Sequence, residues 1–221
     1  MSTVVEPTAE HEPTGAVKET RLWHAQAHMP TVKKHEVLIT RGEGAYVWDS
    51  YGRRLLDAPA ALWFCNVGHG RAEIADAAAR QMRTLAAYSS FQQYATEPAV
   101  QLAERLADMV PVRNAKVFFT SGGGDAIDTA AKLVRRYWSA LGRPGKRTLI
   151  TRTGSYHGLH GYGTSLVGID VHREGIDPLV PETVRVPTND SEALDRLVSE
   201  QRDTIAAFFC EPVVGSGGII H

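Results

Sequence analysis

The fold of this chain is decided by the stretch Val117-Phe118-Phe119-Thr120-Ser121-Gly122-Gly123-Gly124-Asp125-Ala126-Ile127-Asp128-Thr129-Ala130. Its first part is an apolar run of β type that ends in hydroxyl side chains and three glycines. A helix is expected next, because Ile127, Ala130 and Val134 recur at helical spacing. Asp125 suits the N-terminal cap of that helix. The stretch therefore predicts a strand, a glycine-rich turn and a helix.

Such a turn has the properties of an anion-binding site. Glycine lets the backbone approach a ligand closely and adopt positive φ. The first N–H groups of the helix are unpaired and its dipole favours negative charge, which suits a phosphate. The turn carries neither a Walker A ending nor the G-x-G-x-x-G spacing of dinucleotide-binding loops. A plain strand-to-helix turn is the alternative at this point.

Length and composition narrow the classes of function. The 221 residues suffice for one large domain or one and a half. A net charge of -1 without a long basic run makes nucleic acid a poor candidate as partner. No apolar stretch reaches the length of a membrane span, and the polar start has no signal-peptide core. Cys65 and Cys210 lie far apart and form no metal-type pair, so we expect a reduced cytoplasmic setting.

The first third of the chain predicts a tail and a small β unit. Residues 1–16 are expected to be a disordered tail, and a short helix is expected at 18–28. A strand is expected at 37–39. Residues 41–57 predict strand, turn and strand, with the turn at Asp49-Ser50-Tyr51-Gly52. We expect these strands to be antiparallel.

From residue 71 onward, expected helices and strands alternate. The expected helices lie near 72–86, 97–109, from the glycine-rich turn to about 141, and at 192–201; the expected strands lie at 117–120, 148–151, 184–186 and 205–210. This alternation predicts an α/β domain with a mostly parallel sheet. Ligands of such sheets bind at the carboxyl ends of the strands. Because the chain stops soon after a buried strand, we expect it to be the N-terminal part of a longer protein.

Two further motifs follow expected strand ends. Tyr156-His157-Gly158 follows one strand, where a tyrosine can lie flat on an aromatic ligand and a histidine can donate to a ligand or act as a base. Packing and loop anchoring are the alternatives. Glu211 ends the last strand, and a carboxylate there is either exposed or inside a site, because burial without a partner is costly. We expect no metal, because His157 and His160 have no third ligand nearby in the sequence.

These pieces together resemble a known family, the class III pyridoxal-phosphate-dependent aminotransferases, and within it the omega-amino-acid:pyruvate branch. The resemblance runs from about Lys18 to the last residue. It rests on five motifs in the family's order: Arg41 to Asp49, Leu62-Trp63 with Gly68-His69-Gly70, Phe118 to Lys132, Tyr156-His157-Gly158, and Glu211-Pro212-Val213-Val214-Gly215-Ser216-Gly217-Gly218.

The resemblance implies fold type I, an α/β fold with a large domain, a small domain built from both chain ends, and a homodimer. Residues 17–66 would then be the N-terminal part of the small domain, and residues 67–221 an incomplete large domain that binds pyridoxal 5'-phosphate. The implied cofactor-binding residues are Ser121, Gly122, Gly123, Gly124 and Asp125 at the phosphate, Tyr156 on the pyridine ring, and His157 and Glu211 nearby. Trp63, with Tyr88 and Phe91 as neighbours, would line the substrate pocket.

The sequence departs from the family pattern in two ways. Gly124 stands where members commonly have a serine or threonine, so one hydroxyl that could bond the phosphate is missing. The family's Schiff-base lysine and the aspartate that pairs with the pyridine nitrogen are expected beyond His221. Lys116 and Lys132 do not match the lysine position. We therefore expect no catalytic residue within the chain and no activity of the chain alone.

The resemblance implies a transaminase that moves an amino group from an amine or omega-amino acid to a 2-oxo acid such as pyruvate. Two alternatives stay open. One keeps the fold and cofactor and makes the protein an aminomutase or a decarboxylase. The other is a non-catalytic chain that binds the cofactor or completes its sheet with a partner. A Rossmann dehydrogenase is disfavoured, because the glycine fingerprint is missing.

Overall fold

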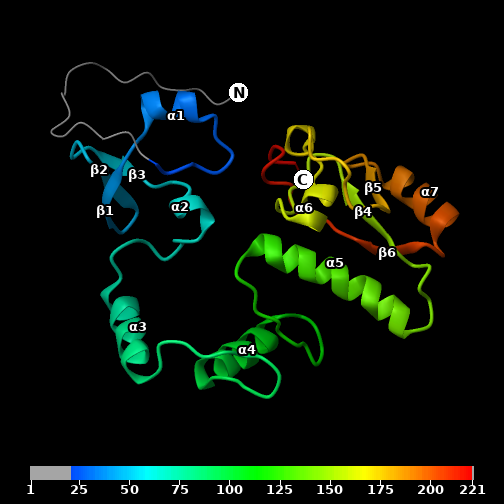
Figure 1. Ribbon diagram of the computed structural model, residues 1–221, viewed down its shortest axis with the longest axis horizontal. Helices are drawn as coiled ribbons and strands as arrows, with labels where there is room; N and C mark the ends of the chain where they lie inside the picture. Colours follow the sequence, from blue (N-terminus) through cyan, green and yellow to red (C-terminus); the bar gives the residue numbers. More distant parts are fainter. Residues whose placement is uncertain (1–20, 221) are drawn as a thin grey trace. The chain divides into compact units, whose positions relative to one another are not determined.

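The computed structural model describes residues 21–220, which form two compact units that divide between Glu97 and Pro98 (Figure 1). The predicted tail at 1–16 lies outside the described residues. The assignment of residues 17–66 to a small domain stays a prediction. Each unit is described by itself below.

The first unit contains a three-stranded antiparallel sheet. Its elements are α1 (Met29–His35), β1 (Ile39–Glu43), β2 (Tyr46–Asp49), β3 (Arg54–Leu56), α2 (Ala60–Trp63) and α3 (Ala72–Thr84). The strands are ordered β1-β2-β3. The predicted antiparallel unit is thus confirmed, although its first strand begins at Ile39 rather than at residue 37.

Asp49 fixes the turn between β2 and β3. Its side chain is buried and accepts from the backbone N–H of Tyr51 at 3.0 Å and of Arg53 at 2.9 Å. The Arg53 guanidinium donates to the second carboxylate oxygen at 2.6 Å. Burial works to raise the pKa of Asp49, but these donors together hold it below its usual value. The predicted turn at 49–52 therefore rests on one carboxylate.

The loop that carries Trp63 has an unusual backbone. Residues 60–63, none of them glycine, have φ between 49° and 74°. Asp57 accepts from the backbone N–H of Ala61 at 2.9 Å and lies 2.7 Å from Nε2 of His69. The His69 backbone in turn pairs with Gly44. Positive φ at such residues is costly, so these contacts are what hold the loop in place.

The second unit is built on a parallel sheet. Its elements are α4 (Glu97–Met109), α5 (Gly123–Ala140), β4 (Thr148–Arg152), α6 (Gly161–Leu166), the 3-10 helix η1 (Asp170–His172), β5 (Thr183–Val186), α7 (Ser191–Gln201) and β6 (Ile205–Phe208). The strand order is β5-β4-β6, and both pairs are parallel. The predicted α/β fold with a mostly parallel sheet is confirmed.

The core of the second unit lies where α5 and α6 meet the sheet. Ala131, Leu149 and Leu166 have no exposed surface and form one apolar cluster. Trp138 adds a polar tie, because its Nε1–H donates to the carbonyl of Ala206 in β6 at 2.9 Å. The helix after the glycine-rich turn is thereby fixed against the sheet, which positions the turn itself.

Two predicted elements are wrong. Residues 117–120 form no strand, and Phe118 is 72% exposed, because β4 has β5 and β6 on its two sides and residues 117–120 have no strand beside them. The described part of the predicted helix at 18–28 is not helical either. A helix begins only at Met29, where Pro30 occupies its first turn.

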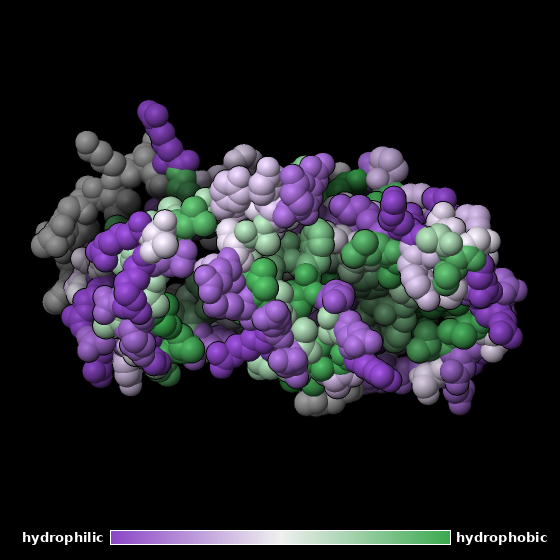
Figure 2. Space-filling model, turned by 90° about the horizontal axis from the view of Figure 1, so that it is seen from below, coloured by the Kyte–Doolittle hydropathy of each residue, from purple (hydrophilic) through white to green (hydrophobic). Residues whose placement is uncertain are grey.

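Large apolar side chains remain at the surface of both units. They include Trp63, Phe64 and Met82 in the first unit and Met109, Phe118 and Ile219 in the second. Figure 2 shows such apolar areas (green) among polar ones (purple). No helix within residues 21–220 is long and apolar enough to cross a membrane.

Leu166→Ala tests the core. Leu166 is fully buried against Ala131 and Leu149, so its truncation leaves a cavity and should lower the free energy of unfolding by about 2–5 kcal/mol. Leu133→Ala is the matched control, because Leu133 lies in α5 but is 52% exposed, and it should change stability by about 0.5 kcal/mol or less. Urea denaturation measures both; equal losses would contradict the assigned core.

Candidate functional site

The candidate site lies at the carboxyl ends of β4 and β6. The loop 153–160 follows β4, and Glu211 follows β6. Since these strands are parallel neighbours, their carboxyl ends share one edge of the sheet. Tyr156, His157 and Glu211, all predicted from the sequence, are thereby brought together.

The Glu211 carboxylate ties two loops to each other. One oxygen accepts from the backbone N–H of Tyr156 at 2.8 Å, and the other accepts from the backbone N–H of Gly215 at 3.1 Å. The carbonyl of Glu211 also accepts from the Arg152 guanidinium. Glu211 therefore positions Tyr156 through the backbone. A position of Glu211 near the pyridine ring of the cofactor and near the substrate stays a prediction.

His157 is a buried histidine with a free ring nitrogen. It is 7% exposed, and its ring packs edge to face on Phe209 with centroids 6.1 Å apart. Its Nε2 has no partner. Burial lowers the pKa of His157, while the Glu211 charge and the Phe209 backbone oppose this shift. Burial thus favours the neutral imidazole, and its Nε2 is a buried atom without a hydrogen-bond partner among the described residues.

The glycine-rich turn touches the Tyr156 loop directly. Gly158 has φ of 84°, and a Cβ on it would lie 2.9 Å from Cα of Gly124. Around Gly122 and Gly123, by contrast, an added Cβ would meet nothing within 4 Å. The exposed Ser121 precedes them. The open space lies at the N-terminus of the 18-residue helix α5, where unpaired N–H groups favour an anion.

Two aspartates at the start of α5 connect it to the segment after Gly158. Asp125 Oδ1 lies 3.1 Å from Nδ1 of His160. Asp128 accepts at 3.0 Å from the backbone N–H groups of Tyr162 and Gly163 at the start of α6. The sequence alone does not identify Asp128 as a site residue, because its position in α5 does not reveal that its side chain caps α6, a helix more than 30 residues further along the chain. His160 was considered only as a metal ligand.

Tyr156 presents an aromatic ring at the same edge of the sheet. The ring of His172 meets it edge to face, with centroids 5.9 Å apart. An open glycine-rich turn and an aromatic ring together suit a phosphorylated aromatic molecule. No three His, Cys, Asp or Glu side chains within residues 21–220 are grouped to hold a metal ion.

The predicted substrate-pocket residues belong to the first unit. Trp63, Tyr88 and Phe91 are exposed, and Tyr88 packs edge to face on Tyr94 at 5.7 Å. Their place at the site stays a prediction.

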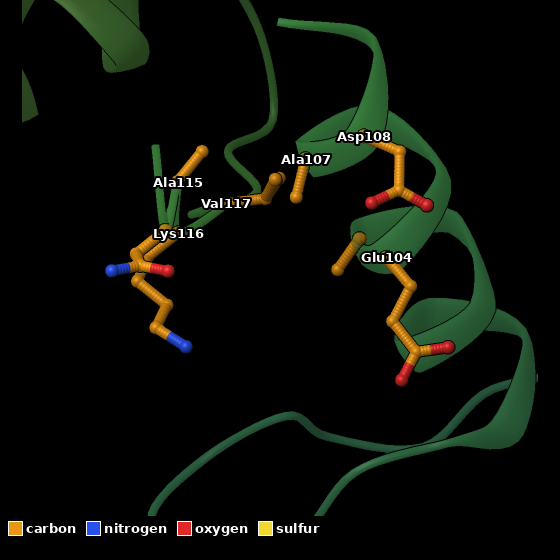
Figure 3. Close-up of a pocket in the computed structure, with 8 residues that line it drawn as sticks. Glu104, Ala107, Asp108, Ala115, Lys116 and Val117 are labelled. Carbon is orange, nitrogen blue, oxygen red and sulfur yellow. The ribbon is translucent and has the colours of Figure 1, made fainter. Parts of the chain in front are cut away.

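A cavity of about 650 Å³ lies elsewhere in the second unit. Glu104 and Asp108 line it from α4, opposite Lys116 and its neighbours (Figure 3). None of the predicted cofactor-binding residues lines this cavity, whose lining combines small apolar with charged side chains and includes no aromatic ring. We therefore place the candidate site at the sheet edge.

Comparisons of sequence identify related proteins. The model of the family described as aminotransferase class-III matches residues 28–221. A putrescine–pyruvate aminotransferase of Pseudomonas aeruginosa is 37% identical, over 91% of this chain and 50% of its own length. A probable aminotransferase of Mycobacterium tuberculosis is 38% identical, over 95% of this chain and 49% of its own length. The chain thus spans about half the length of these curated relatives.

Solved structures agree with this result. A transaminase from the marine bacterium Virgibacillus has a TM-score of 0.86 and 38% identity, covering 90% of this chain and 47% of its own. An amine transaminase from an uncultivated Pseudomonas species, solved in a PLP-bound form, has a TM-score of 0.86 and 34% identity. The match covers 92% of this chain and 50% of that one. The fold and the order of its elements are therefore shared with these proteins.

Glu211→Gln tests the tie between the two loops. The amide nitrogen of glutamine cannot accept a hydrogen bond, so the N–H of Tyr156 or of Gly215 loses its partner. We expect a loss of about 1–3 kcal/mol in unfolding free energy and faster hydrogen exchange in both loops. Glu200→Gln, at an exposed position in α7, should change neither. Unchanged exchange at Tyr156 and Gly215 would contradict the assigned tie.

His157→Gln tests the buried imidazole through pH. The folded state holds the pKa of His157 below its usual value, so the unfolded state binds the proton first as pH falls. The wild-type chain should therefore lose stability below about pH 6.5. Its unfolding free energy should fall with pH more steeply than that of the variant, by the equivalent of up to one bound proton. Denaturation at pH 7.5, 6.5 and 5.5 measures this. Parallel curves for the two proteins would show that His157 is not held neutral by burial.

Proposed function

Since this chain belongs to the class-III aminotransferase family, we propose that it provides the phosphate-binding and ring-binding part of a transaminase that uses pyridoxal phosphate. The complete protein would move an amino group from an amine or omega-amino acid to a 2-oxo acid such as pyruvate. The names of the relatives, a putrescine–pyruvate aminotransferase and gamma-aminobutyrate transaminases, support this substrate class. We also propose that the protein is a cytoplasmic homodimer.

The proposal rests on one observation, the direct contact of Gly158 with Gly124. This contact brings a ring-presenting loop and an anion-binding turn to one edge of the sheet. The N–H groups at Gly122, Gly123 and the start of α5 would donate to the phosphate, and the Tyr156 ring would lie against the pyridine ring. When bound, pyridoxal phosphate supplies an electron sink for the carbon that exchanges its amino group.

The other residues of the site act on this arrangement rather than on the substrate. Glu211 fixes the backbone at Tyr156, and Asp128 fixes α6 against α5. His157, whose neutral form burial favours, packs its ring on Phe209 and helps to hold the loop that carries Tyr156. A rigid support of this kind limits the conformational freedom lost when a ligand binds.

The lysine that attaches the cofactor is proposed to lie outside residues 21–220. In the second unit, Lys116 lines the cavity beside α4, and Lys132 is exposed in the middle of α5. Lys146 donates to the carbonyls of Arg202 and Ile205. We therefore propose that the 221-residue chain does not transaminate by itself.

Cofactor titration tests the proposal. The chain should bind pyridoxal phosphate more tightly than pyridoxal, as measured by fluorescence titration and equilibrium dialysis. Tyr156→Ala should weaken the binding of both compounds about 2- to 12-fold, because ring stacking contributes about 0.5–1.5 kcal/mol. Tyr156→Phe keeps the ring and should bind like the wild type. Equal affinity for the two compounds in the wild type would exclude the phosphate site.

Borohydride treatment of the chain with pyridoxal phosphate, followed by peptide mapping, locates any covalent attachment. We expect only scattered labelling of surface lysines and no alanine from pyruvate with putrescine or 4-aminobutyrate as donor. A specific adduct on one lysine of the chain, or such alanine formation, would contradict the proposed inactivity of the chain alone. Transaminase activity is then measured with a polypeptide as long as the curated relatives.

A further inference from the structure

The ring of His160 occupies the space that a side chain at position 124 would need. A Cβ built on Gly124 would lie 3.2 Å from Nε2 and 3.3 Å from both Cδ2 and Cε1 of His160. Of the three glycines in the turn, only Gly124 meets this ring. A side chain at position 124 and the imidazole would therefore be in tight contact, so the two positions are linked.

Asp125 fixes the orientation of this ring. Its Oδ1 lies 3.1 Å from Nδ1 of His160. Nδ1 is therefore the ring nitrogen that faces the carboxylate. The other nitrogen, Nε2, is the one next to Gly124, at the first turn of α5. Nε2 is thus directed to the place where an anion meets the helix N-terminus.

We propose that His160 is a phosphate ligand of the cofactor site, replacing with its Nε2–H the side-chain hydroxyl that position 124 lacks. This inference rests on the proposed function. In this arrangement Nε2–H of His160 donates to a phosphate oxygen, while Nδ1 stays beside the Asp125 carboxylate.

Apart from its contact with Asp125, the side chain of His160 has no role in holding α6 within the described residues. His160 precedes α6, and its carbonyl accepts from the N–H of Thr164 at 2.7 Å, but its side chain makes no capping hydrogen bond. The start of α6 is held instead by Asp128. Replacing the His160 side chain should therefore leave α6 in place.

The dissociation constant of pyridoxal divided by that of pyridoxal phosphate measures how much the phosphate group adds to binding affinity. His160→Ala should reduce this ratio at least about tenfold, because a hydrogen bond to a charged group is lost. His160→Gln keeps an N–H donor and should retain part of the ratio. His172→Ala is the matched control: its ring contacts Tyr156 rather than the turn, so it should affect both compounds alike.

A double-mutant cycle tests the link between positions 124 and 160. Gly124→Ser in the wild type places Cβ 3.2 Å from Nε2 of His160, so the ring must shift by a few tenths of an ångström, which should also lower the ratio. In the His160→Ala background the serine has room, and its hydroxyl should restore the ratio at least in part. Additive losses in the cycle would overturn the proposed replacement.

The outcomes separate this inference from the function on which it rests. A high wild-type ratio that is unchanged in both His160→Ala and His160→Gln would overturn the role of His160 and leave the phosphate site standing. A wild-type ratio near one would exclude the phosphate site and the inference together. Circular dichroism and urea denaturation confirm that each variant is folded before its ratio is compared.

Discussion

The candidate site depends on the carboxylate of Glu211. Its two oxygens bond backbone N–H groups on two different loops, at Tyr156 and at Gly215. These loops leave neighbouring strands, β4 and β6, at the same edge of the sheet. A backbone amide that is withdrawn from water needs a partner, and loops have no regular ladder to provide one. A single side chain at the end of β6 thus sets the path of the loop that presents the aromatic ring.

The second constraint is the approach of two glycines. Gly158 and Gly124 are so close that a Cβ at Gly158 would lie 2.9 Å from Cα of Gly124, and Gly158 also has positive φ. Close packing of backbone on backbone joins the start of α5 to the loop after β4. Asp128 then fixes α6 beside α5 through two hydrogen bonds. The turn, the loop and the sheet edge therefore form one connected structure.

The sequence predicts the regular parts of this arrangement and misses the contacts between them. Periodicity indicates α5, and the apolar runs indicate β4 and β6, because each depends on local pattern. The strand at 117–120 fails, since a strand also needs a neighbour and no pattern within Val117–Thr120 reports one. Tyr156 and Glu211 are found by their position after strands. The roles of Asp128 and His160 depend on partners distant in the chain, which spacing does not reveal.

The first turn of α5 brings a carboxylate and the proposed phosphate site to the same helix end. An aspartate in the first turn of a helix interacts favourably with the dipole, and Asp125 occupies that position. The same location favours a phosphate, so the two negative charges compete for one helix end. Nδ1 of His160 lies 3.1 Å from the Asp125 carboxylate, and the absence of a side chain at Gly124 leaves the ring its space beside the turn. We therefore propose that the glycine at position 124 and the histidine at position 160 belong to one arrangement at this helix end.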